Sequence, residues 1–208
     1  QQDTFAAAWI GIGGQIDNTL IQTGTEQDSI SGTIEYSAWY ELLPNDSITI
    51  TTMSVSPGDK MTASITLVNS ATNEWAIEIH DVTKGEKFKQ NFSYASSRLS
   101  AEWIVERPDV NNTLSALANF GGITFSDSSV TMNNSTGTIN DFPFAQVIMQ
   151  DRQNRPLVTV SSLTSNGASF TVNYSSSTVS MENQNQQIEA RTTSITEDVR
   201  RKPEPKSP

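Results

Sequence analysis

Ser100-Ala101-Glu102-Trp103-Ile104-Val105-Glu106 is the stretch that decides the fold of this chain. Successive side chains of a β-strand point to opposite faces, so Glu102, Ile104 and Glu106 share one face. The residues between them are apolar and share the other face. This alternation is typical of a strand that is buried on one side. It predicts a sheet from which one carboxyl group, that of Glu102, projects in a rigidly held position.

Strand signals of the same kind extend in both directions from this stretch, and helical periodicity is almost absent. Turn residues separate the expected strands, as in Pro44-Asn45-Asp46, Ser56-Pro57-Gly58-Asp59 and Lys84-Gly85. Many short strands at regular spacing predict an all-β fold, an antiparallel β-sandwich of the concanavalin-like jelly-roll kind. Residues 145–149 are one of the further strands expected, and residues 112–118 are the one helix candidate.

The character of the chain changes near Ser175. From there to Pro208 the sequence is dominated by Gln, Asn, Glu, Lys and Pro. So little apolar surface cannot offset the entropy lost on ordering. We therefore expect one β-sandwich domain over residues 1–175 and a disordered polar tail over residues 176–208.

The composition excludes several kinds of chemistry. Cysteine is absent, which excludes disulfides, Cys-based zinc sites and thiol nucleophiles. His80 is the single histidine, so a metal site with several histidines cannot form. A Ser-His-Asp triad would have to use His80, but its place beside Asp81 near an expected hairpin end favours a surface role. We expect neither a metal nor a cofactor.

The charge of the chain argues against two classes of partner. Lys and Arg number 13 against 23 Asp and Glu, which gives a formal charge of -10. An acidic chain repels phosphate backbones, so we expect no nucleic-acid binding. No run of about 18 apolar residues occurs, so we expect no membrane span. The Ser-, Thr- and Asn-rich, lysine-poor composition is common in secreted β-proteins that work in acid.

Five motifs stand in order along the chain: Ala8-Trp9-Ile10-Gly11-Ile12-Gly13-Gly14, Leu20-Ile21-Gln22-Thr23-Gly24, Ala38-Trp39-Tyr40-Glu41, Ala101-Glu102-Trp103-Ile104-Val105-Glu106 and Leu117-Ala118-Asn119-Phe120-Gly121. In residue type, order and spacing they resemble the glutamic peptidases, or eqolisins, and especially the bacterial members of that family. The resemblance extends from about residue 7 to residue 174, so it implies that residues 1–175 are a β-sandwich peptidase domain.

The resemblance implies a secreted, monomeric acid endopeptidase that acts on proteins or peptides. Eqolisins are β-sandwiches of two antiparallel sheets whose catalytic pair is a glutamine and a glutamate. Gln22 matches that glutamine and Glu102 that glutamate, while Trp9 and Trp39 match aromatic residues of the substrate cleft. Family members have a first strand before the Trp-x-Gly segment that finds no counterpart here, so the expected sandwich lacks its first strand. Gly13 stands where fungal members often have aspartate.

A carboxyl and a carboxamide that share one water molecule can hydrolyse an amide without metal, thiol or histidine. The Glu102 carboxylate would accept a proton from the attacking water and pass it to the leaving amine. The Gln22 amide would bind the water and stabilise the oxyanion. Because the base must be ionised while the leaving nitrogen gains a proton, a carboxyl of pKa near 4 predicts an acidic optimum. Glu26 and Glu41 are further candidates for binding substrate or supporting the site.

Two alternatives remain open on the residues alone. A β-sandwich of this kind serves as readily as a carbohydrate-binding module without activity, because fold does not determine function. A glycoside hydrolase would pair Glu102 with a second carboxylate such as Glu41. That reaction needs carboxyl groups about 5.5 Å or about 6.5–9.5 Å apart.

Overall fold

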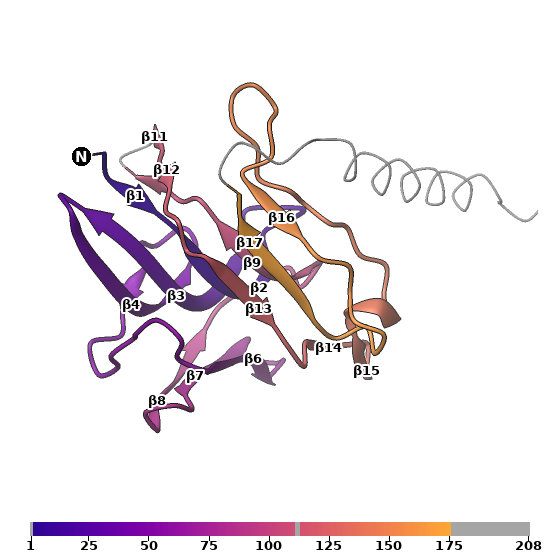
Figure 1. Ribbon diagram of the computed structural model, residues 1–208. Helices are drawn as coiled ribbons and strands as arrows, with labels where there is room; N and C mark the ends of the chain where they lie inside the picture. Colours follow the sequence, from indigo (N-terminus) through magenta and orange to yellow (C-terminus); the bar gives the residue numbers. More distant parts are fainter. Residues whose placement is uncertain (1, 111–112, 176–208) are drawn as a thin grey trace, which may run out of the picture. The chain divides into compact units, whose positions relative to one another are not determined.

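The computed structural model describes residues 2–110 and 113–175 of the chain (Figure 1). Nearly all the regular structure in these residues is β-strand, with one 3-10 helix, η1 (Ile139–Asp141). The prediction of an all-β fold is confirmed. No helix in this part of the chain is long and apolar enough to cross a membrane. The expected disordered tail, residues 176–208, lies outside the described residues.

A seven-stranded sheet carries most of the sequence motifs. Its strands are β1 (Thr4–Phe5), β2 (Ala7–Gly13), β3 (Leu20–Ile30), β4 (Thr33–Leu42), β5 (Ile48–Thr49), β9 (Ala101–Glu106) and β12 (Ala116–Leu117). The strand β2 lies between β3 and β9, and β4 lies between β3 and β5. Pairing is antiparallel throughout except between β1 and β12, which are parallel. This order places the four motif strands side by side as β9, β2, β3 and β4.

The hairpin of β3 and β4 is the longest in the sheet and sets its register. Ile30 pairs with Thr33, so the connection is only Ser31 and Gly32. Both have positive φ, 51° and 83°, as a two-residue hairpin turn of the mirror-image type requires. Glycine at the second position adopts this conformation at no steric cost. Figure 1 shows the two strands as a long indigo-to-purple ribbon pair.

The back face of the sheet, defined by Ile21, Ala38 and Tyr40, is buried in the main hydrophobic core. It packs against Trp75, Ile77 and Ile79 of β7, in which every second residue faces inward. Ile21 and Ile77 have no exposed surface. Burying one such side chain contributes about 1.5–3 kcal/mol. The strands β6 (Met61–Asn69), β7 (Glu74–Asp81) and β8 (Glu86–Ser93) form the antiparallel sheet that supplies this second layer.

A second core lies behind the β9 side of the same sheet. It joins Val105 of β9 and Leu117 of β12 to Val158 and Val172. The last two belong to an antiparallel sheet of β13 (Gly122–Phe125), β16 (Val158–Val160) and β17 (Phe170–Tyr174). Two small hairpins complete the described strands: β10 (Asp109–Val110) with β11 (Thr113–Leu114), and β14 (Ser129–Met132) with β15 (Ser135–Thr138). The two layers form the predicted β-sandwich.

Two local predictions are wrong. The described part of the helix candidate at residues 112–118 is strand, because β11 pairs with β10 and β12 pairs with β1. Tertiary pairing here overrides a weak local preference for helix. Residues 145–149 form no ladder and are followed only by an isolated bridge between Gln150 and Pro156. Val147 is 73% exposed, so this segment does not turn its apolar side chains to one buried face.

Candidate active site

Four residues on adjacent strands lie in one line across the seven-stranded sheet. Glu102 of β9 pairs with Gly11 of β2, Gly11 pairs with Gln22 of β3, and Gln22 pairs with Glu41 of β4. We call this line the Gly11 row. Directly paired residues share a face, so Glu102, Gln22 and Glu41 all project from the front face, opposite the main core. The register therefore brings the two predicted catalytic side chains to either side of one glycine.

Gly11 has no side chain because there is no room for one. A Cβ atom at this position would lie 3.1 Å from Glu102 Oε2, 2.7 Å from Trp9 Cζ3 and 2.9 Å from Leu20 Cδ1. The Glu102 carboxyl group consequently leans over β2, toward the strand that carries Gln22. Gly11 has no assigned role in the sequence prediction, although a glycine inside an apolar strand is a known signal of close approach by a neighbouring group.

The Gln22 side chain is 6% exposed and is held from one side. Its Nε2 donates a short hydrogen bond to Oε2 of Glu41. Its Oε1 is buried and has no hydrogen-bond partner among the described residues. Buried polar atoms without partners are uncommon and frequently mark a functional site.

Glu102 is the second buried polar group of the row. Neither of its oxygens makes a well-formed hydrogen bond to the described residues. Burial raises the pKa of Glu102 above its ordinary value, and the nearby Ser100 hydroxyl offsets part of this shift. The group therefore holds its proton to a higher pH than an exposed glutamate does. Glu102 and Gln22 together place three unpaired acceptor atoms on the two sides of Gly11.

Trp9 and Trp39 lie in the next line across the sheet, the Trp9 row, in which Ile104, Trp9, Gly24 and Trp39 pair in that order. The tryptophans are only 8% and 5% exposed. They pack with Ala7, Leu20 and Ile104 into a front-face cluster. A Cβ atom at Gly24 would lie 2.6 Å from Trp9 Cβ, so glycine is needed here too. Both predicted cleft residues thus form an apolar floor beside Gln22 and Glu102.

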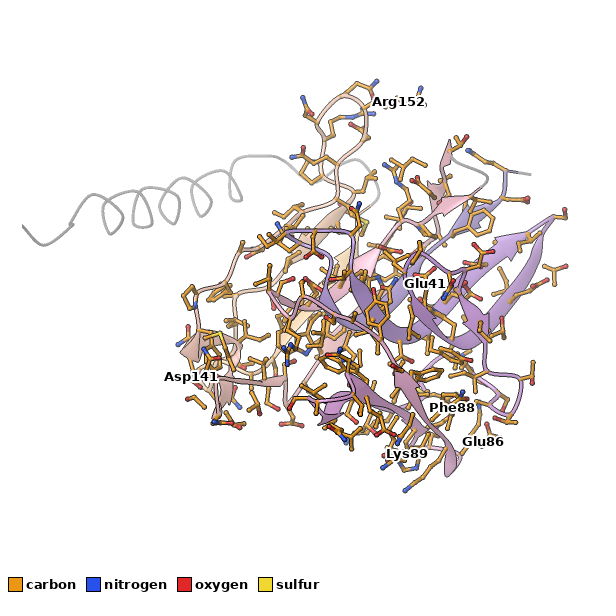
Figure 2. The ribbon with its side chains drawn as sticks, turned by 180° about the vertical axis from the view of Figure 1, so that it is seen from behind. Glu41, Glu86, Phe88, Lys89, Asp141 and Arg152 are labelled. Atoms are coloured by element: carbon orange, nitrogen blue, oxygen red, sulfur yellow. The ribbon has the colours of Figure 1, made fainter. Side chains whose placement is uncertain are left out.

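Glu41 and Glu26, the other two candidate site residues, differ in their distance from Gln22. Glu41 contacts Gln22 directly and is half-buried, and burial raises its pKa while the Gln22 hydrogen bond opposes the shift. In Figure 2 its side chain lies amid the strands of the sheet. Glu26 lies two rows further along β3, about 13 Å from Gln22 at the rise of a strand. It accepts a 2.5 Å hydrogen bond from Ser37 Oγ, so the structure does not bring it to Gln22.

The front face continues beyond the tryptophans into an acidic region that sequence reasoning missed. Burial raises the pKa of Glu106, with smaller effects of the same sign from Glu41 and Asp109, whereas the Trp9 indole N–H lowers it. Burial also raises the pKa of Asp28, to about 6, with further contributions from Glu26 and Glu35. The strands β2, β3, β4 and β9 contain no Lys, Arg or His to compensate these carboxylates.

The geometry separates the remaining chemical alternatives. In the described part of the chain, no three His, Cys, Asp or Glu side chains are grouped so that they could hold a metal ion. Glu102 and Glu41 stand three strands apart, about 14 Å between their backbones at normal strand spacing. The Gln22 carboxamide occupies the position between them. Along the row, the carboxamide of Gln22 is thus nearer to Glu102 than the carboxyl group of Glu41 is.

Comparison with known proteins gives one consistent answer. A sequence model of the peptidase A4 family matches residues 1–174. Aspergillopepsin-2 of Aspergillus niger is 29% identical over 178 residues, which cover 83% of this chain and 60% of that protein. The chain thus spans about 60% of the length of this relative.

Two solved structures are similar to the fold described above. The crystal structure of aspergilloglutamic peptidase from Aspergillus niger superimposes with a TM-score of 0.72 at 28% identity, covering 83% of this chain and 99% of that one. Scytalido-glutamic peptidase, solved with a transition state analog inhibitor, gives a TM-score of 0.69 at 25% identity, covering 84% and 85% of the two chains.

Proposed function

Because the chain belongs to the peptidase A4 family, we propose that it is an acid endopeptidase with Glu102 and Gln22 as its catalytic pair. The observation that carries this proposal is the register of the Gly11 row, which sets a carboxyl and a carboxamide on either side of a residue without a side chain. The two similar solved structures are both named as glutamic peptidases. These names support the same class of reaction for this chain.

The reaction follows from the hydrogen-bonding capacity of the two groups. An ionised Glu102 accepts a proton from a water molecule while the water oxygen forms a bond to the scissile carbonyl carbon. A Gln22 N–H donates to the resulting oxyanion, and one such donor is worth about 3 kcal/mol of transition-state stabilisation. The protonated Glu102 then gives its proton to the leaving amine as the C–N bond breaks.

The pKa of Glu102 determines the lower limb of the pH profile. Because only the ionised carboxylate acts as a base, activity falls as the pH drops through this pKa. Burial raises the pKa, so the limb lies above the pKa of about 4.3 of an exposed glutamate.

Substrates are proteins or peptides bound over the front face. Trp9 and Trp39 form the apolar floor beside the reacting bond. Glu26 and Glu41 complete the substrate-binding set, Glu26 toward the acidic end and Glu41 beside Gln22. No metal or cofactor takes part in this reaction. The peptidase domain is residues 1–175.

The proposed setting of the enzyme rests on its family resemblance, and its composition is consistent with it. Like the eqolisins that it resembles, the protein is a secreted monomer. It engages neither membrane nor nucleic acid, whose phosphates its net charge of -10 repels. In acid most of its carboxylates become neutral, and a lysine-poor surface then avoids strong positive self-repulsion.

The test is cleavage of casein and of a quenched fluorescent peptide between pH 3 and pH 6, with the aspartic-protease inhibitor pepstatin present. The unmodified protein is expected to cleave both, and Glu102→Gln and Gln22→Ala are each expected to lose activity by orders of magnitude. The matched control is Glu35→Gln, which changes an exposed carboxylate on the same front face, in β4. This variant is expected to retain activity. Full cleavage by Glu102→Gln would overturn the proposal. Sugar binding without cleavage would instead favour the carbohydrate-binding module.

A further inference from the structure

Gln22 is placed between two carboxyl groups, and only one of them touches it. Glu41 lies directly opposite Gln22 on β4 and accepts the hydrogen bond from its Nε2. Glu102 lies on the other side, beyond Gly11. A carboxamide has one donor end and one acceptor end, so the end that faces Glu41 decides which end remains for Glu102.

Two orientations of the Gln22 amide are sterically equivalent and chemically opposite. With Nε2 toward Glu41, Oε1 remains on the side of Glu102, and the second N–H of Nε2 remains free to donate to the oxyanion. A water molecule there donates one proton to Oε1 and one to the Glu102 carboxylate, and its lone pairs stay available for the carbonyl carbon. In the reversed orientation Nε2 faces Glu102 and donates to the same water molecule. That hydrogen bond occupies a lone pair that the attack on the carbonyl carbon needs.

We propose that Glu41 is a positioning residue for catalysis: its carboxylate holds the Gln22 amide with Nε2 toward itself and Oε1 toward Glu102. An ionised Glu41 only accepts hydrogen bonds, so it repels Oε1 and excludes the reversed orientation. A protonated Glu41 donates as well as accepts and permits both orientations. This inference rests on the proposed function of Gln22 and Glu102.

Among the described residues of the neighbouring strands, no Lys, Arg or His side chain is present to stabilise the negative charge of Glu41. Burial raises the pKa of Glu41, and Asp46, in the turn after β4, adds to this shift by charge repulsion. Glu102 and Glu106 lie on the same face from β9, and Glu26 lies on it from β3. The strand β2 contributes no titratable group. The pKa of Glu41 is therefore raised, as is that of Glu102.

The first test is Glu41→Gln, which keeps the size of the side chain and removes its charge. The introduced carboxamide donates and accepts equally well, so it no longer excludes the reversed orientation, and the negative charge of Glu102 favours the orientation with the donor end toward it. We expect kcat to fall roughly 10- to 100-fold, with KM within about threefold of the parent. Glu35→Gln on the same strand and face is the control and changes neither. An unchanged kcat in Glu41→Gln overturns the inference.

The pH profile separates positioning from simple structural support. In the parent, protonation of Glu41 also lowers activity, so log kcat falls with a slope steeper than 1 over the pH range in which both carboxyl groups titrate. In Glu41→Gln only Glu102 titrates, and the slope becomes about 1. Asp46→Asn, a change at an exposed turn, removes a charge that raises the pKa of Glu41 and shifts the limb downward by a few tenths of a pH unit. A slope steeper than 1 that persists in Glu41→Gln contradicts the inference.

A double-mutant cycle identifies the residue through which Glu41 acts. If Glu41 works only by orienting Gln22, then Gln22→Ala and the Gln22→Ala/Glu41→Gln double variant have the same kcat. An equal loss from Glu41→Gln in both backgrounds means a direct role for Glu41 and overturns the inference. A fully active Glu102→Gln defeats the proposed function itself, which is a different result from either. Thermal midpoints of all variants exclude misfolding as the cause.

Discussion

The two faces of the seven-stranded sheet are made by alternate residues of the same strands, yet they differ in almost every physical property. On the back face Ile21 and Tyr40 pack on β7 in a dry core. On the front face, one residue away, Gln22 and Glu102 bury oxygens that have no hydrogen-bond partner in the described structure. The back face holds the fold together, while the front face keeps unsatisfied polar groups that weaken it. The two-residue period of a strand allows both in one sheet.

The largest effect is expected from Glu102→Gln on the front face. Cleavage should fall at least about a thousandfold, equivalent to about 4 kcal/mol of transition-state stabilisation. The thermal midpoint should stay the same or rise, because a buried carboxyl group with a raised pKa is replaced by a neutral amide. Steady-state kinetics and thermal unfolding of the same samples check this. A large loss of stability would mean that the two faces are not separate in function.

The complementary change is Ile77→Ala in the layer behind the sheet. It removes a side chain with no exposed surface and leaves a cavity in the main core. The free energy of unfolding should fall by about 3 kcal/mol, while activity per folded molecule stays near that of the parent. Urea unfolding combined with active-site titration measures the two quantities. Lost activity in molecules that remain folded would show that the back face tunes the site.

Gly11→Ala tests the residue on which the front-face geometry depends. The new methyl group would overlap Trp9 and Leu20 and push against Glu102. We expect a loss of about 2 kcal/mol of stability together with a fall of at least tenfold in kcat. Gly122→Ala, in a short strand of the other layer where the nearest atom is a flexible Asn173 side chain, is a suitable control. Normal kinetics in Gly11→Ala would show that Glu102 does not need to lean over β2.

The smallest effect concerns stability against pH. The pKa of Asp28 is raised from 3.8 to about 6, so its stabilising contribution is fully present below about pH 4 and is lost as the pH rises toward and through 6. Because the group is only half-buried, solvent screening reduces the effect to about 1 kcal/mol. Asp28→Asn should remove this part of the pH dependence, as measured by urea unfolding at pH 4 and pH 7. An unchanged difference between the two pH values would contradict it.

The faces of the strands follow from sequence alone, but their partners do not. The alternation around Glu102 predicts correctly that Ile104 and Glu106 share its face, since both lie on the front face. The helix candidate near residue 116 fails because Ala116 and Leu117 pair with β1, far away in the chain. The raised pKa values of Asp28 and Glu106 arise chiefly from burial, which no local sequence pattern reveals, with smaller contributions from nearby carboxylates.

The sequence by itself determined that this is an all-β protein, which side chains share a face of each strand, and, through the order of five motifs, its similarity to a peptidase family. These are local properties, set by a backbone that turns each side chain away from the last. Only the tertiary structure decided that Gly11 stands between Gln22 and Glu102, and that Glu41 is the residue that holds Gln22. Strand register depends on the packing of whole faces against their partner layers, and a slip of one residue would reverse every one of these contacts.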